Sequence, residues 1–361
     1  MKVIVVGAGA AGLAIGWRLA QAGAQVAVLE RGQPGRGATW AAAGMIAAPD
    51  DCETELAGRA ADLWPGFAAE IEAASGRPVG YRRDGGLFLA TTSEENNGFS
   101  ARAGEFLSAA AAREMEPRLA PDVTGAIWNP NEAKVDNRAL GRALAACLVR
   151  AGGELAANET VVCFEMRDTR IVGVRTPFAI HQADVYVLAA GAWSARIQGL
   201  PADALPPVVP LKGEMLALEA PAGEALPRPA IVRGDIYMVA QRGRLLVGAT
   251  VERAGFDSAL TLAAREWLLA GARMIMPCLG EWQLAEHWAG LRPGSPDDLP
   301  ILGASVLDNL FVASGQFRSG ILYTPAIAEA VCALVLGGNT SFDIAAYDPR
   351  RFAGLAADIR S

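Results

Sequence analysis

The chain has 361 residues, of which 52% are hydrophobic and 20% are charged, and its formal net charge is −7. This composition is typical of a soluble α/β protein, and the length is sufficient for two lobes, each with its own core. The acidic balance argues against nucleic acid and against an anionic membrane surface as partners. The longest late apolar stretch, Ala326 to Leu336, is too short to span a bilayer.

The five cysteines are scattered along the chain, and no C-x-x-C pair occurs. This pattern is unlike a disulfide framework or a zinc site, so we predict no metal and a reducing compartment. The apolar N-terminus superficially resembles a signal peptide, but a glycine triplet and β-branched valines are more typical of a nucleotide-binding strand. The sequence therefore predicts a cytoplasmic protein.

The first thirty residues predict the start of a dinucleotide-binding fold. An apolar strand over residues 3–6 leads into Gly7, Gly9 and Gly12, a helix follows, and a second strand ends at Glu30. The glycines allow a tight turn, close approach to a pyrophosphate, and packing of the helix against the strand. The acid can accept hydrogen bonds from both hydroxyls of a ribose. Strand, glycines, helix and acid together predict a dinucleotide site.

The remaining elements alternate between helices and short strands. A run of very small residues at 39–45 would let the backbone approach a flat ring system. In the first half we predict a helix over 53–74, a hairpin over 81–91 that turns at 84–86, helices over 101–115 and 138–151, and strands over 160–164, 171–174 and 184–191. In the second half we predict a strand over 211–218, a hairpin over 236–250 that turns at 241–243, a helix over 260–276, a strand over 309–315, and a helix that opens at Pro325.

The order of these elements favours a flavin over a nicotinamide cofactor. A nicotinamide enzyme normally places its substrate lobe after one continuous nucleotide-binding unit, whereas here the last strand, glycine and helix return to the nucleotide fold. The N-terminus of that last helix suits a partly negative flavin edge, because it offers free N–H groups and a favourable dipole.

The predicted fold class is α/β, with a discontinuous Rossmann-like FAD-binding domain and an antiparallel-sheet substrate domain. We assign residues 1–78, 138–205 and 288–361 to the FAD-binding domain, and residues 79–137 and 206–287 to the substrate domain. A substrate pocket is expected where the two domains meet.

Several motifs carry a resemblance that covers nearly the whole chain. They are V-I-V-V-G-A-G-A-A-G with Glu30, A-A-A-G-M at 41–45, V-L-A-A-G-A-W-S at 187–194, L-K-G-E-M-L at 211–216, G-R-L-L-V-G-A-T at 243–250, W-A-G-L-R-P at 288–293 and G-Q-F-R-S-G-I-L at 315–322. Together they resemble the D-amino-acid oxidase family of flavoproteins. Within that family they are most similar to the members that oxidise glycine in the thiazole branch of thiamine biosynthesis.

The resemblance implies a set of cofactor-binding residues. In it, Ala10 and Ala11 would lie at the pyrophosphate, Val161 would meet the adenine through its backbone, and residues 316–322 would wrap the pyrimidine side of the flavin. The full set is Gly7, Gly9, Ala10, Ala11, Gly12, Glu30, Arg31, Ala38, Thr39, Ala43, Gly44, Met45, Val161, Gly191, Gln316, Phe317, Arg318, Ser319, Gly320, Ile321 and Leu322. No cysteine lies in 314–322, so the FAD is expected to be non-covalent.

The resemblance also implies catalytic and substrate-binding roles for Arg292, Tyr237 and Arg318. Arg292 would clamp the substrate carboxylate, because a planar guanidinium forms bidentate, charge-assisted bonds to such a group. Tyr237 would donate a second hydrogen bond, and Arg318 would lie nearby. Hydride transfer from the substrate Cα–H to the flavin needs no side-chain base if the amine binds neutral, so catalysis is mainly orientation.

The implied function is FAD-dependent oxidative deamination of glycine or another small amino acid. Its products are an imine or 2-oxo acid, ammonia and hydrogen peroxide, with dioxygen as the acceptor and thiazole biosynthesis as the destination. The sequence leaves open a sarcosine or D-amino-acid oxidase, a dehydrogenase with another electron acceptor, and a flavin-binding subunit without turnover. It also leaves the oligomeric state open, a homo-oligomer included.

Two residues depart from the pattern expected of the family. Gln316 stands where many relatives carry histidine, which puts in doubt any contribution of that group to flavin reoxidation. Trp40 is larger than expected within the run of small residues, and is large enough to alter the mouth of the pocket.

Overall fold

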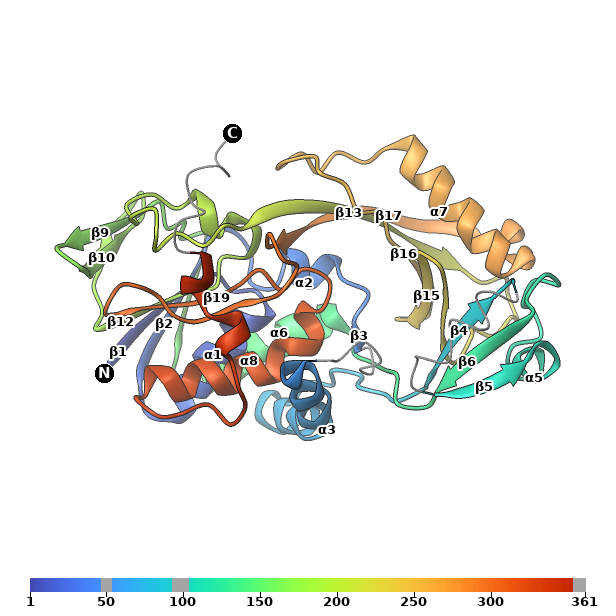
Figure 1. Ribbon diagram of the computed structural model, residues 1–361, viewed down its shortest axis with the longest axis horizontal. Coiled ribbons are helices and arrows are strands. Elements are labelled where there is room, and N and C mark those ends of the chain that lie inside the picture. Colours follow the sequence, from blue (N-terminus) through green and yellow to red (C-terminus); the bar gives the residue numbers. More distant parts are fainter. Residues whose placement is uncertain (47–53, 93–103, 353–361) are drawn as a thin grey trace.

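The computed structural model describes residues 1–46, 54–92 and 104–352. Figure 1 shows an elongated molecule with a helix-covered sheet at one end and a larger curved sheet at the other. In the part of the chain that is described, no helix is long and apolar enough to cross a membrane. That same part contains no group of three or more histidine, cysteine or acidic side chains that could hold a metal ion.

The first sheet has six strands in the order β18-β19-β12-β1-β2-β8. All neighbours pair in parallel except β18 and β19. The strands are β1 (Lys2–Val6), β2 (Gln25–Glu30), β8 (Glu154–Ala157), β12 (Val185–Leu188), β18 (Ile301–Ala304) and β19 (Leu310–Ser314). The sheet thus gathers segments from the start, middle and end of the chain.

Strand β1 is buried on both faces, as its run of apolar residues predicts. Val3 and Val5 pack against helices on one side, while Ile4 and Val6 pack against a small three-stranded sheet on the other. The helices are α1 (Ala10–Gln21), α3 (Glu55–Ser75), α6 (Asn137–Arg150) and α8 (Gly320–Val335), and the small sheet is β9 (Cys163–Arg167), β10 (Arg170–Arg175) and β11 (Ile180–His181). Parallel strands covered on both faces are the expected setting of a nucleotide site.

The second sheet has eight strands in the order β17-β13-β16-β15-β14-β4-β6-β5, antiparallel except where β14 meets β4. They are β4 (Gly86–Ala90), β5 (Glu105–Ser108), β6 (Gly125–Asn129), β13 (Val209–Glu219), β14 (Ala230–Arg233), β15 (Ile236–Gln241), β16 (Arg244–Gly248) and β17 (Gln283–Gly294). Helix α7 (Leu262–Ile275) packs on its outer face through Leu268 and Ala272, which meet Leu216 and Leu218 in one core. Helix α5 (Ala109–Met115) lies beside β5 and β6.

Several short elements lie outside these sheets. They are α2 (Ala38–Ala41), the two-stranded sheet of β3 (Met45–Ile46) and β7 (Ala133–Lys134), and 3-10 helices at Gly191–Arg196, Pro277–Glu281, Ala345–Tyr347 and Pro349–Phe352. The long strands β13 and β17 reach from the eight-stranded sheet toward the first sheet (Figure 1). The predicted fold class, a Rossmann-like domain joined to an antiparallel-sheet domain, is confirmed. The residue limits of the domains remain a proposal, and the limit between 287 and 288 falls inside β17.

The predicted hairpin over 81–91 is wrong. Only Gly86–Ala90 forms a strand, and it pairs with β6 and β14, while Arg82 bridges to Lys134. The glycine pair at 85–86 suggests a turn, but Gly85 serves another purpose here. A Cβ on Gly85 would lie 1.9 Å from the ring of Trp128. Gly85 is therefore needed for close packing of an aromatic side chain on the backbone.

The predicted helix over 101–115 is too long. Residues 101–103 lie outside the described residues, Glu105–Ser108 is a strand that pairs with β6, and only Ala109–Met115 is helical. Ser108 ends the strand and caps the helix, since its Oγ accepts a hydrogen bond from the N–H of Ala111 at 3.2 Å. A serine within an alanine-rich run thus marks a helix start.

Other boundaries shift by a few residues. Helix α8 opens at Gly320, five residues before the predicted start at Pro325, which lies after the first turn of the helix. Strand β9 begins at Cys163, so most of the predicted strand 160–164 is loop, and β8 has no counterpart among the predicted elements. The predicted start of the helix over 53–74 falls at Glu53, which lies outside the described residues.

Candidate active site

A cavity of about 1300 Å³ lies between the carboxyl ends of β1, β2 and β12 and the inner face of the eight-stranded sheet. All of the predicted site residues line it except Gly12. Those that do are Gly7, Gly9, Ala10, Ala11, Glu30, Arg31, Ala38, Thr39, Ala43, Gly44, Met45, Val161, Gly191, Tyr237, Arg292, Gln316, Phe317, Arg318, Ser319, Gly320, Ile321 and Leu322. The fold therefore brings residues from the start, the middle and the end of the chain to one place.

The glycine turn after β1 is built from close backbone contacts. Gly7 has φ +104°, and a Cβ there would lie 2.4 Å from the carbonyl oxygen of Ala189. A Cβ on Gly12 would lie 2.0 Å from the carbonyl oxygen of Gly7. Gly12 thus lies behind the cavity wall, where it lets α1 start directly against the turn. The N–H of Ala10, the first residue of α1, donates to Thr39 Oγ1 at 2.9 Å, and no acidic residue lies in the first turn to oppose an anion there.

Glu30 and Arg31 lie at one end of the cavity. The Glu30 carboxylate accepts hydrogen bonds from the N–H groups of Ala8 at 2.8 Å and Gly32 at 3.0 Å, so it is fixed at the edge of the turn. The Arg31 guanidinium lies over the ring of Trp193, 3.4 Å from its centroid. Burial lowers the pKa of Arg31, although the charge of Glu30 opposes this effect. Trp193 also lines the cavity, and sequence reasoning missed it because a single aromatic side chain in a short 3-10 helix has no periodic signal.

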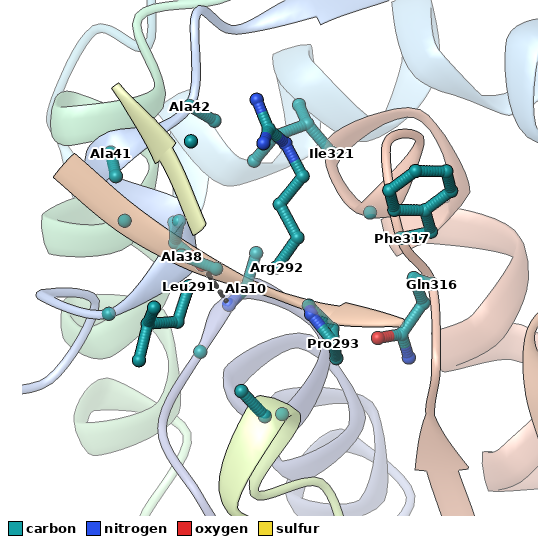
Figure 2. Close-up of a pocket in the computed structure, with 18 of the residues that line it drawn as sticks. Ala10, Ala38, Ala41, Ala42, Leu291, Arg292, Pro293, Gln316, Phe317 and Ile321 are labelled. Carbon is teal, nitrogen blue, oxygen red and sulfur yellow. Dashed lines mark hydrogen bonds between the residues drawn. The ribbon is translucent and has the colours of Figure 1, made fainter. Parts of the chain in front are cut away.

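The segment before α8 closes another wall of the cavity. Phe317 has φ +44°, a backbone conformation that is uncommon for a bulky residue, and its N–H donates to the carbonyl of Pro293 at 2.9 Å. The side-chain nitrogen of Gln316 is buried and has no hydrogen-bond partner among the described residues. Figure 2 shows Gln316 and Phe317 together at the end of this loop, near Pro293. A strained residue beside an unpaired buried donor indicates a binding function.

The small-residue run of α2 is held in place by side chains of distant elements. Asn137 of α6 donates from Nδ2 to the carbonyls of Thr39 at 2.7 Å and Trp40 at 3.0 Å. Gln241 of β15 donates to the carbonyl of Ala43 at 2.6 Å, and the indole of Trp288 donates to that of Ala41 at 2.9 Å. Sequence reasoning missed these positioning side chains, because each is far from residues 38–45 in sequence.

Trp40 is not among the residues that line the cavity. Its ring has the Arg138 guanidinium 3.7 Å and the Arg36 guanidinium 4.5 Å from the centroid, and it contacts Trp288 edge-on. The prediction that this side chain alters the pocket mouth is therefore not supported. Its size is used instead to pack α2 against α6 and β17.

Arg292 reaches into the cavity from β17 (Figure 2). Its Nη1 donates to the carbonyl of Thr250 at 3.0 Å, and no carboxylate of the described residues lies within ion-pair distance of it. A Cβ on Gly213, in the neighbouring strand β13, would lie 2.0 Å from Nη1, so this glycine provides the space for the guanidinium. Burial lowers the pKa of Arg292. A guanidinium nevertheless stays protonated in proteins. A charged, half-buried guanidinium without an acidic partner is suited to bind a carboxylate.

Tyr237 and Arg318 complete this part of the cavity. A Cβ on Gly248, which pairs with Tyr237, would lie 2.4 Å from its ring, so the sheet makes room for the phenol. Burial raises the pKa of Tyr237, although the nearby charges of Arg292 and Arg318 oppose this effect. The phenol is therefore protonated near neutral pH and can donate a hydrogen bond. Arg318 is exposed and lines the cavity.

We expect Gly213→Ala to weaken substrate binding about tenfold without unfolding the protein. The added Cβ would displace only the end of a flexible arginine side chain, since the contact of 2.0 Å is with Nη1 of Arg292. Steady-state kinetics would then show a higher KM. Gly58→Ala is a matched control, because a Cβ there meets nothing within 4 Å. A KM that equals that of the unchanged protein would contradict this account of Gly213.

The arrangement fits the FAD expected from the sequence. A glycine-built turn and the start of α1 are suited to a pyrophosphate, and the fixed carboxylate of Glu30 is suited to a ribose. The small residues of α2 leave room for a flat ring, and the unpaired nitrogen of Gln316 lacks only an acceptor. Ser319 makes no side-chain cap to α8, and the first residues of that helix, Gly320 to Leu322, also line the cavity.

Comparisons with known proteins agree with this description. A family model described as FAD dependent oxidoreductase (DAO) matches residues 2–334. The chain is 32% identical to the glycine oxidase of Pseudomonas aeruginosa, over 96% of this chain and 98% of that protein. It is 35% identical to a bifunctional protein ThiO/ThiG of Synechocystis sp., over 97% of this chain, and it spans about half the length (54%) of that relative. The crystal structure of glycine oxidase from Geobacillus kaustophilus superposes with a TM-score of 0.89 at 32% identity, over 96% of this chain and 98% of that one.

Proposed function

The chain belongs to the DAO family of FAD-dependent oxidoreductases, and on this basis we propose that it oxidises glycine. The oxidation would give the imine and hydrogen peroxide, and hydrolysis of the imine would then give the 2-oxo acid and ammonia. The observation that carries the proposal is Arg292, a half-buried guanidinium with no acidic partner among the described residues, in the same cavity as the nucleotide turn. Identity of 32% over nearly the full length of a glycine oxidase supports the choice of substrate.

The protein contributes binding and orientation to this reaction. FAD, when bound, supplies the hydride acceptor. Arg292 binds the substrate carboxylate through charge-assisted hydrogen bonds, and the protonated phenol of Tyr237 donates a further one. The exposed Arg318 adds a second positive charge, which favours entry of a carboxylate. A small amino acid held in this way keeps its Cα–H in one orientation within the cavity. Such fixed geometry accounts for much of the rate enhancement of the reaction.

Neither histidine is placed as a base in the described structure. His287 Nε2 lies 2.7 Å from Glu214 and His181 Nε2 lies 3.0 Å from Glu159, and neither histidine lines the cavity. The geometry is therefore consistent with a substrate whose amine is neutral when it reacts, so that only the Cα–H bond is broken.

Anaerobic mixing tests the proposed function. We expect glycine to remove the visible flavin absorbance of the FAD-loaded protein, and admission of air to restore it with formation of hydrogen peroxide. Sarcosine, N-ethylglycine and D-alanine serve as comparison substrates. Reduction by sarcosine but not by glycine would indicate a secondary-amine oxidase. Slow recovery in air would indicate a dehydrogenase, and no reduction by any of these compounds would indicate a flavoprotein without turnover.

We further propose that the product feeds thiazole biosynthesis and that the reaction takes place in the cytoplasm. The first part is supported by the resemblance of the motifs to members of that pathway, and by the similarity to ThiO/ThiG proteins. The second part is supported by the cysteines, because Cys147, Cys163, Cys278 and Cys332 are all free, as expected in a reducing compartment.

A further inference from the structure

The pairing of β13 with the chain after β16 changes register close to Arg292. Leu216 pairs with Val247, and unbroken antiparallel pairing would then bring Lys212 opposite Val251. Lys212 instead bridges to Glu252, so one extra residue is accommodated in the chain after β16. Such an irregularity redirects the groups beside it and is frequent near active sites.

Thr250 lies where the register changes, and its side-chain hydroxyl, rather than its backbone carbonyl, accepts the hydrogen bond from β13. The N–H of Glu214 donates to Thr250 Oγ1 at 2.9 Å, and the N–H of Thr250 donates to the Glu214 carbonyl at 3.3 Å. Because the hydroxyl takes the hydrogen bond of the strand, the carbonyl of Thr250 is released from the sheet. That carbonyl accepts the hydrogen bond from Arg292 Nη1 at 3.0 Å.

The hydroxyl of Thr250 is held from its other side as well. It donates to Glu252 Oε1 at 2.8 Å, and the N–H and carbonyl of Glu252 both bond to Lys212 at 2.9 Å. Behind this segment, on the face of β13 away from Arg292, the buried carboxylate of Glu214 bonds to Lys212 Nζ at 2.8 Å. The position of the Thr250 carbonyl is thus fixed by a charged network that does not line the cavity.

We propose that Thr250 is a positioning residue that aims Arg292 at the substrate carboxylate. Its hydroxyl turns the chain so that a backbone carbonyl, rather than a side chain, orients the guanidinium. A carbonyl leaves the charge of Arg292 available, whereas a carboxylate at that place would compete with the substrate. This inference rests on the proposed function, in which Arg292 binds that carboxylate.

The test compares Thr250→Val with Thr250→Ser in the FAD-loaded, full-length protein. Valine has the shape of threonine but cannot accept from Glu214 or donate to Glu252, whereas serine keeps both hydrogen bonds. We expect Thr250→Val to raise the KM for glycine about tenfold or more, with kcat changed less than about threefold. Thr250→Ser should stay within about twofold of the unchanged protein in both constants.

Two further measurements separate positioning from a general structural role. Binding of glycolate, a carboxylate without an amine, is followed by its effect on the flavin spectrum and should weaken by the same factor as KM, while the affinity for FAD stays constant. An unchanged KM in Thr250→Val would overturn the proposal, and so would a loss of FAD affinity that accounts for the change.

If Thr250→Val does not fold, Glu252→Ala decides the question, because the side chain of Glu252 is 37% exposed and the buried Lys212 keeps its ion pair with Glu214. Its KM should rise about threefold or more, and an unchanged KM would then overturn the proposal. Glycine oxidation by the unchanged protein tests the proposed function separately. If that protein oxidises glycine while the variants behave identically to it, only the role of Thr250 fails.

Discussion

Arg292→Ala is expected to weaken substrate binding by about 2–5 kcal/mol, which corresponds to a rise in KM of roughly thirtyfold to several thousandfold. The guanidinium is the charged group that the cavity offers to a carboxylate beside Tyr237, and among the described residues it has no acidic partner. Its removal deprives the substrate carboxylate of its half-buried cationic partner, and the exposed Arg318 compensates only in part. Because that carboxylate also orients the Cα–H, kcat should fall too.

Steady-state kinetics with glycine and glycolate binding measure this effect. The KM of Arg292→Lys should lie between those of the unchanged protein and Arg292→Ala, since lysine keeps the charge but loses the planar pair of donors. Arg273→Ala, which removes an exposed arginine of α7 that does not line the cavity, is the matched control and should change neither constant. Kinetics of Arg292→Ala equal to those of the control would remove Arg292 from the site.

The nucleotide-binding part of this site could be predicted from the sequence because its determinants are local. A buried strand, glycines at short spacing, a helix and an acid follow one another within thirty residues, and each has one physical reason to be there. The close contacts of Gly7 and Gly12 are those that the pattern predicts. Arg292, Tyr237 and the segment at 316–322 were predicted through the resemblance to a family, and not from spacing.

The substrate side could not be predicted in the same way, because its determinants pair across strands. Gly213 leaves space for Arg292, and Gly248 leaves space for Tyr237, but each glycine alone resembles a weak point of a strand. The hairpin over 81–91 was predicted wrongly for the same reason, since Gly85 resembles a turn residue but in fact accommodates the ring of Trp128. The function of such glycines depends on which strand lies beside them. That information is absent from local sequence patterns.

The last prediction concerns the ion pair of Lys212 and Glu214, which are 2% and 0% exposed. Lys212→Met is expected to lower the free energy of unfolding by about 3–5 kcal/mol, because it leaves a buried carboxylate without its cation. The remaining partners of that carboxylate, Thr261 at 3.0 Å and His287 at 2.7 Å, offset only part of the loss. Urea denaturation near neutral pH measures the difference. Arg244→Met is the control, since its partners Glu219 and Glu286 are 48% and 25% exposed, and it should cost about 1 kcal/mol or less.

The pH dependence of this difference follows from the two pKa shifts. Burial alone would raise the pKa of Glu214, but the hydrogen bonds from Lys212 and Thr261 outweigh it, so the pKa lies below its ordinary value. Its contribution to stability is therefore complete above the ordinary pKa of a glutamate, and is lost as pH falls through the lower value of the folded state. Burial alone would lower the pKa of Lys212, but the interaction with Glu214 outweighs this effect and raises it. The contribution of Lys212 to stability is therefore lost only as pH rises through this raised pKa. The difference in the free energy of unfolding between the unchanged protein and Lys212→Met should thus stay constant across neutral pH. It should become smaller in acid, where the carboxylate of Glu214 becomes neutral. Equal free energies of unfolding for the two proteins near neutral pH would show that the buried pair contributes no more than an exposed one.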